Sequence, residues 1–126
     1  MNLSALITQL ETVSDLTGKV MVGMPAQLEN IGSAPYAWLT NVVETAGGSP
    51  VTGPVRQRVD LRVEITVGAQ TLDGMLSVRD DIRAALIGFQ IDGGHDPMTF
   101  RAGRMEFADP GWNLWRDDYA TAYYIN

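Results

Sequence analysis

The fold is decided by two neighbouring segments that read as β-strands, Met98-Thr-Phe-Arg-Ala-Gly-Arg-Met-Glu-Phe-Ala108 and Leu114-Trp-Arg-Asp-Asp-Tyr-Ala-Thr-Ala-Tyr-Tyr-Ile125, with a Pro110-Gly111 turn between them. The second segment is rich in Trp and Tyr, which favour strands. A segment so close to the end of a chain frays unless it is tied into a sheet. We therefore predict a C-terminal hairpin that forms part of a larger sheet.

A third strand is predicted over residues 55–67, where apolar and polar side chains alternate. A period of two places one set on the buried face of a sheet and the other set on the opposite face. The buried set comprises Val59, Leu61, Val63, Ile65 and Val67. The opposite set comprises Arg58, Asp60, Arg62, Glu64 and Thr66. We call Arg58, Asp60, Arg62 and Glu64 the charge ladder, because their signs alternate.

Two segments have helical spacing. The first begins after Asn2, a capping residue, and ends near Asp15. Its apolar stripe comprises Leu3, Leu6, Ile7, Leu10 and Val13. The second helix is predicted over Leu72–Phe89. Its core stripe comprises Met75, Val78, Ile82, Ala85, Leu86 and Phe89.

Two shorter strands, Lys19–Val22 and Pro35–Val43, complete the set of predicted elements. Residues 45–54 hold three Gly and two Pro and are predicted to form a loop. The resulting order is helix, three strands, helix, two strands. It predicts an α+β fold, a mostly antiparallel sheet of about five strands with two helices packed on one face. The length of 126 residues predicts one domain, 1–126.

Composition excludes several classes of protein. The chain has no cysteine, so it has no disulfide framework, thiol nucleophile or Cys-based zinc site. Its net charge of −6 disfavours tight binding of nucleic acid. The first residues lack the features of a signal peptide, and no apolar run is long enough to span a membrane. We expect a soluble protein made in the cytoplasm.

No motif for catalysis or phosphate binding stands out. His95 is the only histidine and is interpreted as a turn residue rather than a base or metal ligand. The pairs Asp80-Asp81 and Asp117-Asp118 point in different directions on a helix or strand, so each is interpreted as surface or interface charge. Gly47-Gly48 and Gly93-Gly94 match no phosphate-loop pattern. We predict no catalytic residues, no metal site and no cofactor.

The aromatic residues allow two interpretations. They could stack on nucleic-acid bases, as on some RNA-binding sheets, or they could fill a core. Base stacking needs interleaved basic residues, and the second strand of the hairpin carries Asp117 and Asp118 instead. Core packing is favoured. The residues concerned are Trp38, Trp112, Trp115, Tyr119, Tyr123 and Tyr124.

Two surfaces are candidates for subunit contacts. The charge ladder is either a solvated sheet face or a surface that meets a complementary one on a second subunit. On the second helix, Leu76, Asp80, Arg83 and Ile87 lie off the core stripe. The two apolar members need cover from a loop of the same chain or from a neighbouring subunit, and we favour the neighbour. Eight Arg against one Lys also suits an interface, although GC-rich genomes favour Arg codons too.

As a whole, the chain resembles the tail terminator proteins of long-tailed bacteriophages and related prophages. The resemblance covers nearly the full length and rests on the order and spacing of several segments. These are the opening helix Met1–Leu10, the strand entry Val55–Val59, the helix end Asp81–Gln90, Phe100–Met105 and the aromatic finish Leu114–Tyr119.

The resemblance implies a structural role. Six copies are expected to close into a ring on the head-proximal end of the tail tube, stop its polymerisation and present a docking surface for the neck of the filled head. The implied partners are the chain itself, the tail tube protein and a head-completion or neck protein. The implied location is the tail–neck region of the virion. Six copies at −6 each carry −36, which would let DNA pass without specific binding if the acids line the bore.

Contact with the tube or neck is expected from the 45–54 loop, in particular from Gly47, Gly48, Ser49, Pro50, Val51 and Thr52. Two other functions stay open. The chain could be a neck or head-completion protein, which is also a small ring-forming class. It could also be an enzyme or small-molecule binding module, although the lone histidine and the missing phosphate loop disfavour that.

Overall fold

The computed structural model describes residues 3–25, 35–46, 57–106 and 111–125. Its elements follow the predicted order, with one short 3-10 turn added. They are α1 (Leu3–Leu10), η1 (Ser14–Leu16), β1 (Val20–Val22), β2 (Tyr36–Ala46), β3 (Gln57–Ala69), α2 (Leu72–Leu86), β4 (Thr99–Glu106) and β5 (Asn113–Ile125).

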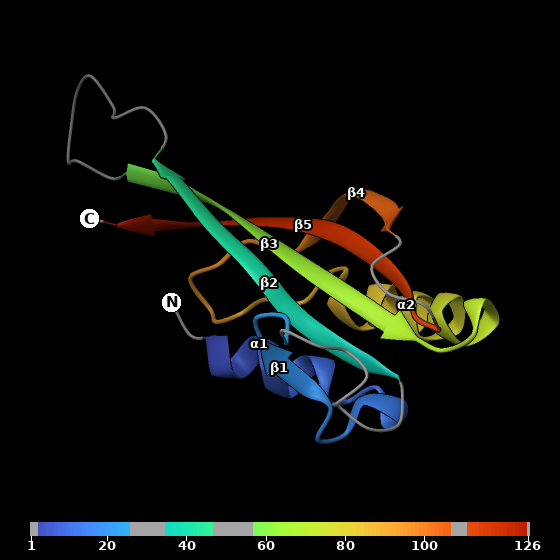
Figure 1. Cartoon of the computed structure of the whole chain (residues 1–126). Helices are drawn as coiled ribbons and strands as arrows, with labels where there is room; N and C mark the ends of the chain where they lie inside the picture. The colour runs from blue at the N-terminus through green and yellow to red at the C-terminus, as the bar shows by residue number, and fades with distance from the viewer. Residues whose placement is uncertain (1–2, 26–34, 47–56, 107–110, 126) are drawn as a thin grey trace.

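The five strands form one sheet in the order β1-β2-β3-β5-β4 (Figure 1). Short β1 runs parallel to β2, and the other neighbours are antiparallel. β5 pairs with β3 over its whole length, from Gln57 opposite Ile125 to Ala69 opposite Asn113. The predicted α+β fold is confirmed, and the aromatic C-terminal strand lies inside the sheet rather than at its edge.

Both helices pack on one face of the sheet, where they share an apolar core with the strands (Figure 1). The predicted alternation of β3 is confirmed, because Val59, Leu61, Val63, Ile65 and Val67 are all buried. Leu6 and Leu10 enter this core from α1. From α2 come Met75, Val78, Ile82 and Leu86. Burial of such side chains contributes about 1.5–3 kcal/mol each.

A second apolar cluster lies on the opposite face, at one end of the sheet. Trp38, Trp112 and Leu114 are buried in it, so these aromatic side chains pack in a core as predicted. β3 passes beneath this cluster at Gly68. A Cβ there would lie 2.7 Å from Leu114 Cδ2 and 2.8 Å from the Trp38 ring, so only glycine leaves room for both.

Several predicted boundaries are wrong. α1 ends at Leu10 instead of continuing to Asp15, and α2 ends at Leu86 instead of Phe89. The cause in α2 is local, because Ile87 is extended and Gly88 has φ +85°, a conformation that suits glycine at a helix end. β2 continues to Ala46, two residues into the predicted loop. Residues 47–56 lie outside the described part of the chain.

Candidate functional site

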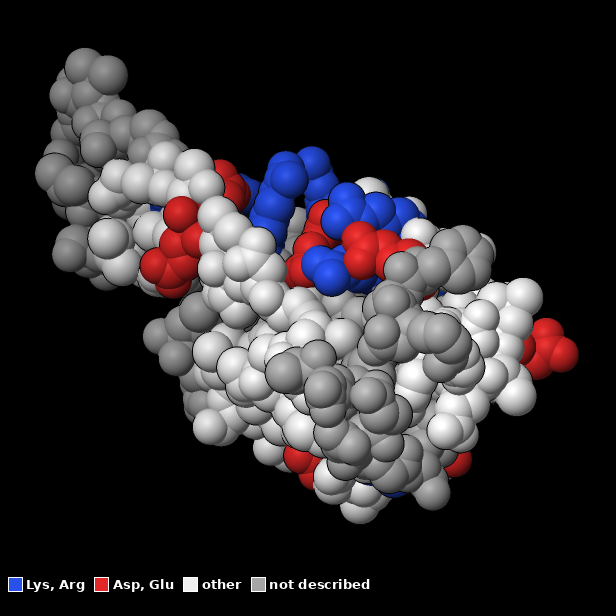
Figure 2. Space-filling model, viewed as in Figure 1, with Lys and Arg blue, Asp and Glu red and all other residues white. Residues whose placement is uncertain are grey.

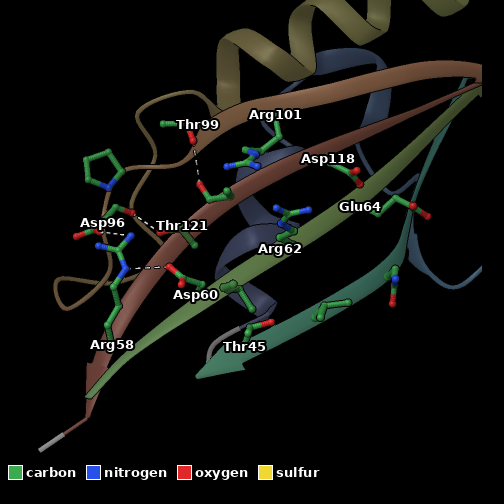
Figure 3. Close-up of a pocket in the computed structure, with 15 residues that line it drawn as sticks. Thr45, Arg58, Asp60, Arg62, Glu64, Asp96, Thr99, Arg101, Asp118 and Thr121 are labelled. Carbon is green, nitrogen blue, oxygen red and sulfur yellow. Dashed lines mark hydrogen bonds and ion pairs between the residues drawn. The ribbon is translucent and has the colours of Figure 1, made fainter. Parts of the chain in front are cut away.

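The charge ladder lies on the sheet face opposite the helices, as the alternation of β3 predicts. Arg58, Asp60 and Arg62 are exposed and Glu64 is half-buried. They line a groove of about 720 Å³ together with residues of β2, β4, β5 and the segment before β4 (Figure 3). Charged side chains gather over β4 and β5, whereas much of the same view is uncharged (Figure 2). We call the groove that the charge ladder lines the ladder groove.

At one end of the ladder groove the charges are already paired. Arg58 Nε lies 2.8 Å from Asp60 Oδ1, and its guanidinium is 3.9 Å from Asp96. The hydrogen bond to Asp60 and the charge of that carboxylate raise the pKa of Arg58. All three side chains are about half exposed. Exposed pairs of this kind contribute little to stability, because solvent screens the charges.

The other end is also paired. Glu64 Oε1 accepts a 2.7 Å hydrogen bond from Thr40 Oγ1 and lies 3.4 Å from Arg116. The Arg116 guanidinium is in turn 2.6 Å from Glu106 Oε2, and Arg104 lies 2.9 Å from the other oxygen of Glu106. The ladder residue Glu64 is therefore paired within its own chain.

The middle of the ladder groove is different. Arg62 of β3 and Arg101 of β4 form no ion pair or hydrogen bond with any described residue, and both are exposed. Asp118 of β5, on the strand between them, has no such partner either within the described ranges. Guanidinium groups bind carboxylates through two parallel hydrogen bonds. Chemically, the groove centre can receive an acidic surface.

The candidate patch on α2 is not one surface. Leu76 is partly buried against the main core, so the same chain covers it in part. Arg83 stacks on the Phe100 ring at 4.4 Å. Asp80 is exposed, and Ile87, beyond the end of the helix, is 52% exposed. Of the two apolar members, Ile87 alone offers a free apolar side chain to a neighbour.

Sequence reasoning missed a buried ion pair. The Asp117 carboxylate is 3% exposed and accepts hydrogen bonds from Arg79 Nε at 2.9 Å and from Arg79 Nη2 at 3.0 Å. The Arg79 guanidinium also stacks on the Trp115 ring at 4.3 Å. Gly103 lies opposite Asp117 on β4. The interpretation of Asp117 as surface or interface charge is therefore wrong.

The signal for this pair was present in the sequence. Asp117 is in phase with Trp115 and Tyr119, so period two places it on the core face of β5. Arg79 follows Met75 by four residues and so lies on the buried stripe of α2. Burial raises the pKa of Asp117, and the hydrogen bonds and charge of Arg79 only partly offset this effect.

His95 lies in the predicted turn but is buried. Its Nδ1 is 2.7 Å from Asp92 Oδ1, and its ring lies 5.0 Å from the ring of Tyr123. The hydrogen bond from His95 lowers the pKa of Asp92. His95 therefore fastens the segment before β4 to the end of β5.

Within residues 3–25, 35–46, 57–106 and 111–125, no cluster of three or more His, Asp or Glu side chains could hold a metal ion. No helix in those ranges is both long and apolar enough to cross a bilayer.

Comparison with known proteins gives the class of this chain. The family model for the phage tail terminator protein matches residues 1–126, which is every residue. The chain belongs to the phage tail terminator family. The resemblance seen in the sequence is thereby confirmed. This terminator chain is a structural protein of a phage tail and a component of the virion.

A solved structure is similar to this chain in fold. A chain of the "Virion of native gene transfer agent (GTA) particle" matches with a TM-score of 0.66 and 14% sequence identity. The match covers 97% of the terminator chain and 93% of the other chain. A comparison with curated protein sequences finds no significant match.

Proposed function

We propose that six copies of the terminator chain close into a ring on the head-proximal end of the tail tube. The ring ends polymerisation of the tube and presents a docking surface for the neck of the filled head. The observation that carries this proposal is the family match over all 126 residues. The proposed role requires no catalysis and no cofactor.

The distribution of surfaces supports assembly into a ring. A closed ring needs a heterologous contact, in which one patch meets a different patch on the next copy. The terminator chain offers unlike surfaces on opposite sides of its sheet. One side holds the ladder groove with Arg62 and Arg101, and the other holds the exposed parts of α2, including Asp80 and Ile87.

Two further features belong to the proposal. The segment 47–52 (Gly47, Gly48, Ser49, Pro50, Val51, Thr52), which lies outside the described residues, is proposed to contact the tube or neck. Six copies at −6 each give a ring of charge −36. A net negative ring weakens nonspecific attraction to phosphates, so DNA can pass through the lumen.

Deletion of the gene tests the function through the length of the tails. The proposal predicts overlong tails of variable length without attached heads, because nothing stops addition of tube subunits. Electron micrographs of a lysate measure this directly, and a plasmid copy of the wild-type gene should restore normal length.

The same micrographs separate the alternatives. Tails of normal length beside unjoined heads would contradict tube termination and favour a neck or head-completion protein. Normal infectious particles would contradict any structural role in the neck, and would return attention to binding of small molecules.

A further inference from the structure

The middle of the ladder groove holds two exposed guanidinium groups, with the Asp118 carboxylate on the strand between them. Both ends of the groove are occupied by ion pairs within the subunit, whereas Arg62 and Arg101 in the middle have no partner among the described residues. Both side chains rise from the same open face of the sheet (Figure 3). β3 and β4 are separated by β5, so the two residues start about 10 Å apart, at about 4.8 Å per strand.

The outer face of α2 carries matching groups. Asp73, Asp80 and Asp81 are all exposed, and none forms an ion pair or hydrogen bond with a described residue. Asp73 and Asp80 are seven residues apart, so they lie on one face about 10 Å apart along the helix. Between and beyond them, Ser77 and Ala84 are small and exposed. This face is therefore acidic and low in relief.

No basic group of the same helix neutralises this face. The guanidinium of Arg79 is held by Asp117 in the core, and that of Arg83 lies over the Phe100 ring. Spacing and charge thus match between the acidic face of α2 and the middle of the ladder groove. The two lie on opposite sides of the sheet, so they cannot meet within one chain.

We propose that α2 of one copy lies in the ladder groove of the next copy, with its acidic face on Arg62 and Arg101. This contact rests on the proposed ring, and it assigns the two patches that form each junction. Because a groove meets a helix, every open oligomer keeps one free groove at one end and one free helix at the other until the ring closes.

The absence of cysteine makes this contact directly measurable. Asn41 lies on the β2 wall of the groove, and Ser77 lies between the carboxylates of α2. A variant with Asn41→Cys and Ser77→Cys keeps all five charges. This variant should form a series of cross-linked oligomers when it is treated with a short bismaleimide, both as purified chain and in assembled tails. Each single variant should give none, and neither should Asn41→Cys with Ser4→Cys on α1.

Charge reversal gives the second measurement in the same background. Adding Arg62→Glu and Arg101→Glu should reduce the cross-linked fraction at least tenfold. Adding Asp73→Arg and Asp80→Arg as well should restore it. Circular dichroism of each variant should match the parent, because all four positions are exposed.

Three results would overturn the contact. The first is an absence of cross-linked oligomers in both preparations, the second is cross-linking that charge reversal at Arg62 and Arg101 does not change, and the third is loss of cross-linking that the reversed α2 charges do not restore. These results are separable from the test of function. Overlong tails after gene deletion, without cross-linked oligomers in the double-cysteine variant, would support the terminator role and contradict this contact. Charge-dependent cross-linking together with tails of normal length after deletion would support the contact between α2 and the ladder groove and contradict the role in tube termination.

Discussion

Replacing Asp117 by Asn should lower the free energy of unfolding by about 3 kcal/mol. The substitution removes the charge that faces Arg79 but leaves that guanidinium, which is 11% exposed, in the core. Breaking one partner of a buried ion pair typically costs about 3–5 kcal/mol. Urea unfolding followed by circular dichroism measures the change. Asp118→Asn, one residue away on the groove face, is the matched control and should change stability by less than about 0.5 kcal/mol.

The raised pKa of Asp117 also predicts how the stability of the unmutated protein depends on pH. Burial raises the folded pKa above the unfolded value, so ionisation of this group reduces stability as the pH rises through that interval. Protonation and Asp117→Asn are not equivalent, because a protonated carboxyl can turn its O–H away from Arg79, whereas the Asn amide presents an N–H donor to the Arg79 donors. Desolvation of the two charged groups opposes the attraction between them. Replacing both partners, Arg79→Met with Asp117→Leu, should recover most of the loss seen in Asp117→Asn. Equal unfolding midpoints for Asp117→Asn and Asp118→Asn would contradict the assignment of a buried pair.

Gly103→Ala should destabilise the fold by about 3 kcal/mol. An added Cβ would lie closer to Asp117 Oδ1 than atoms can approach, and 2.7 Å from Trp115 Nε1 and 3.0 Å from Arg79 Nη2. Overpacking alone costs about 1–3 kcal/mol, and here it also displaces the buried ion pair. Thermal and urea unfolding should both show the loss.

Gly93→Ala is the control for Gly103→Ala. An added Cβ at Gly93 meets no atom within 4 Å, so the same chemical change should leave stability within about 0.5 kcal/mol. If Gly103→Ala were as stable as Gly93→Ala, the close packing of β4 against the Arg79–Asp117 pair would be wrong.

Periodicity predicted most of the fold because α2 and much of β3 are buried on one side and meet water on the other. Alternation in β3 and the stripe of α2 placed Val63 and Ile82 in the core correctly. The strand order, the parallel pairing of β1 and the ends of the helices did not follow from periodicity. They depend on which strands meet across the chain and on local conformations such as that of Gly88.

The candidate site was predicted less completely. The sequence placed the charge ladder on one face, but it could not show which charges pair across strands. Glu64 is neutralised by Arg116, 52 residues away, while Arg62 pairs with no residue in the described part of the chain. Leu76 lies off the predicted core stripe of α2, yet it is partly buried against the main core. The interpretation of both Asp117 and Asp118 as surface or interface charge was wrong for Asp117, because strand phase places that residue on the core face of β5.

A cryo-electron microscopy reconstruction of the junction between head and tail in intact particles tests the proposed ring directly. We expect density for a ring of six terminator chains on the last layer of tail tube, between the tube and the neck. Density at that position that does not fit this five-stranded fold, or terminator chains found only elsewhere in the particle, would contradict it.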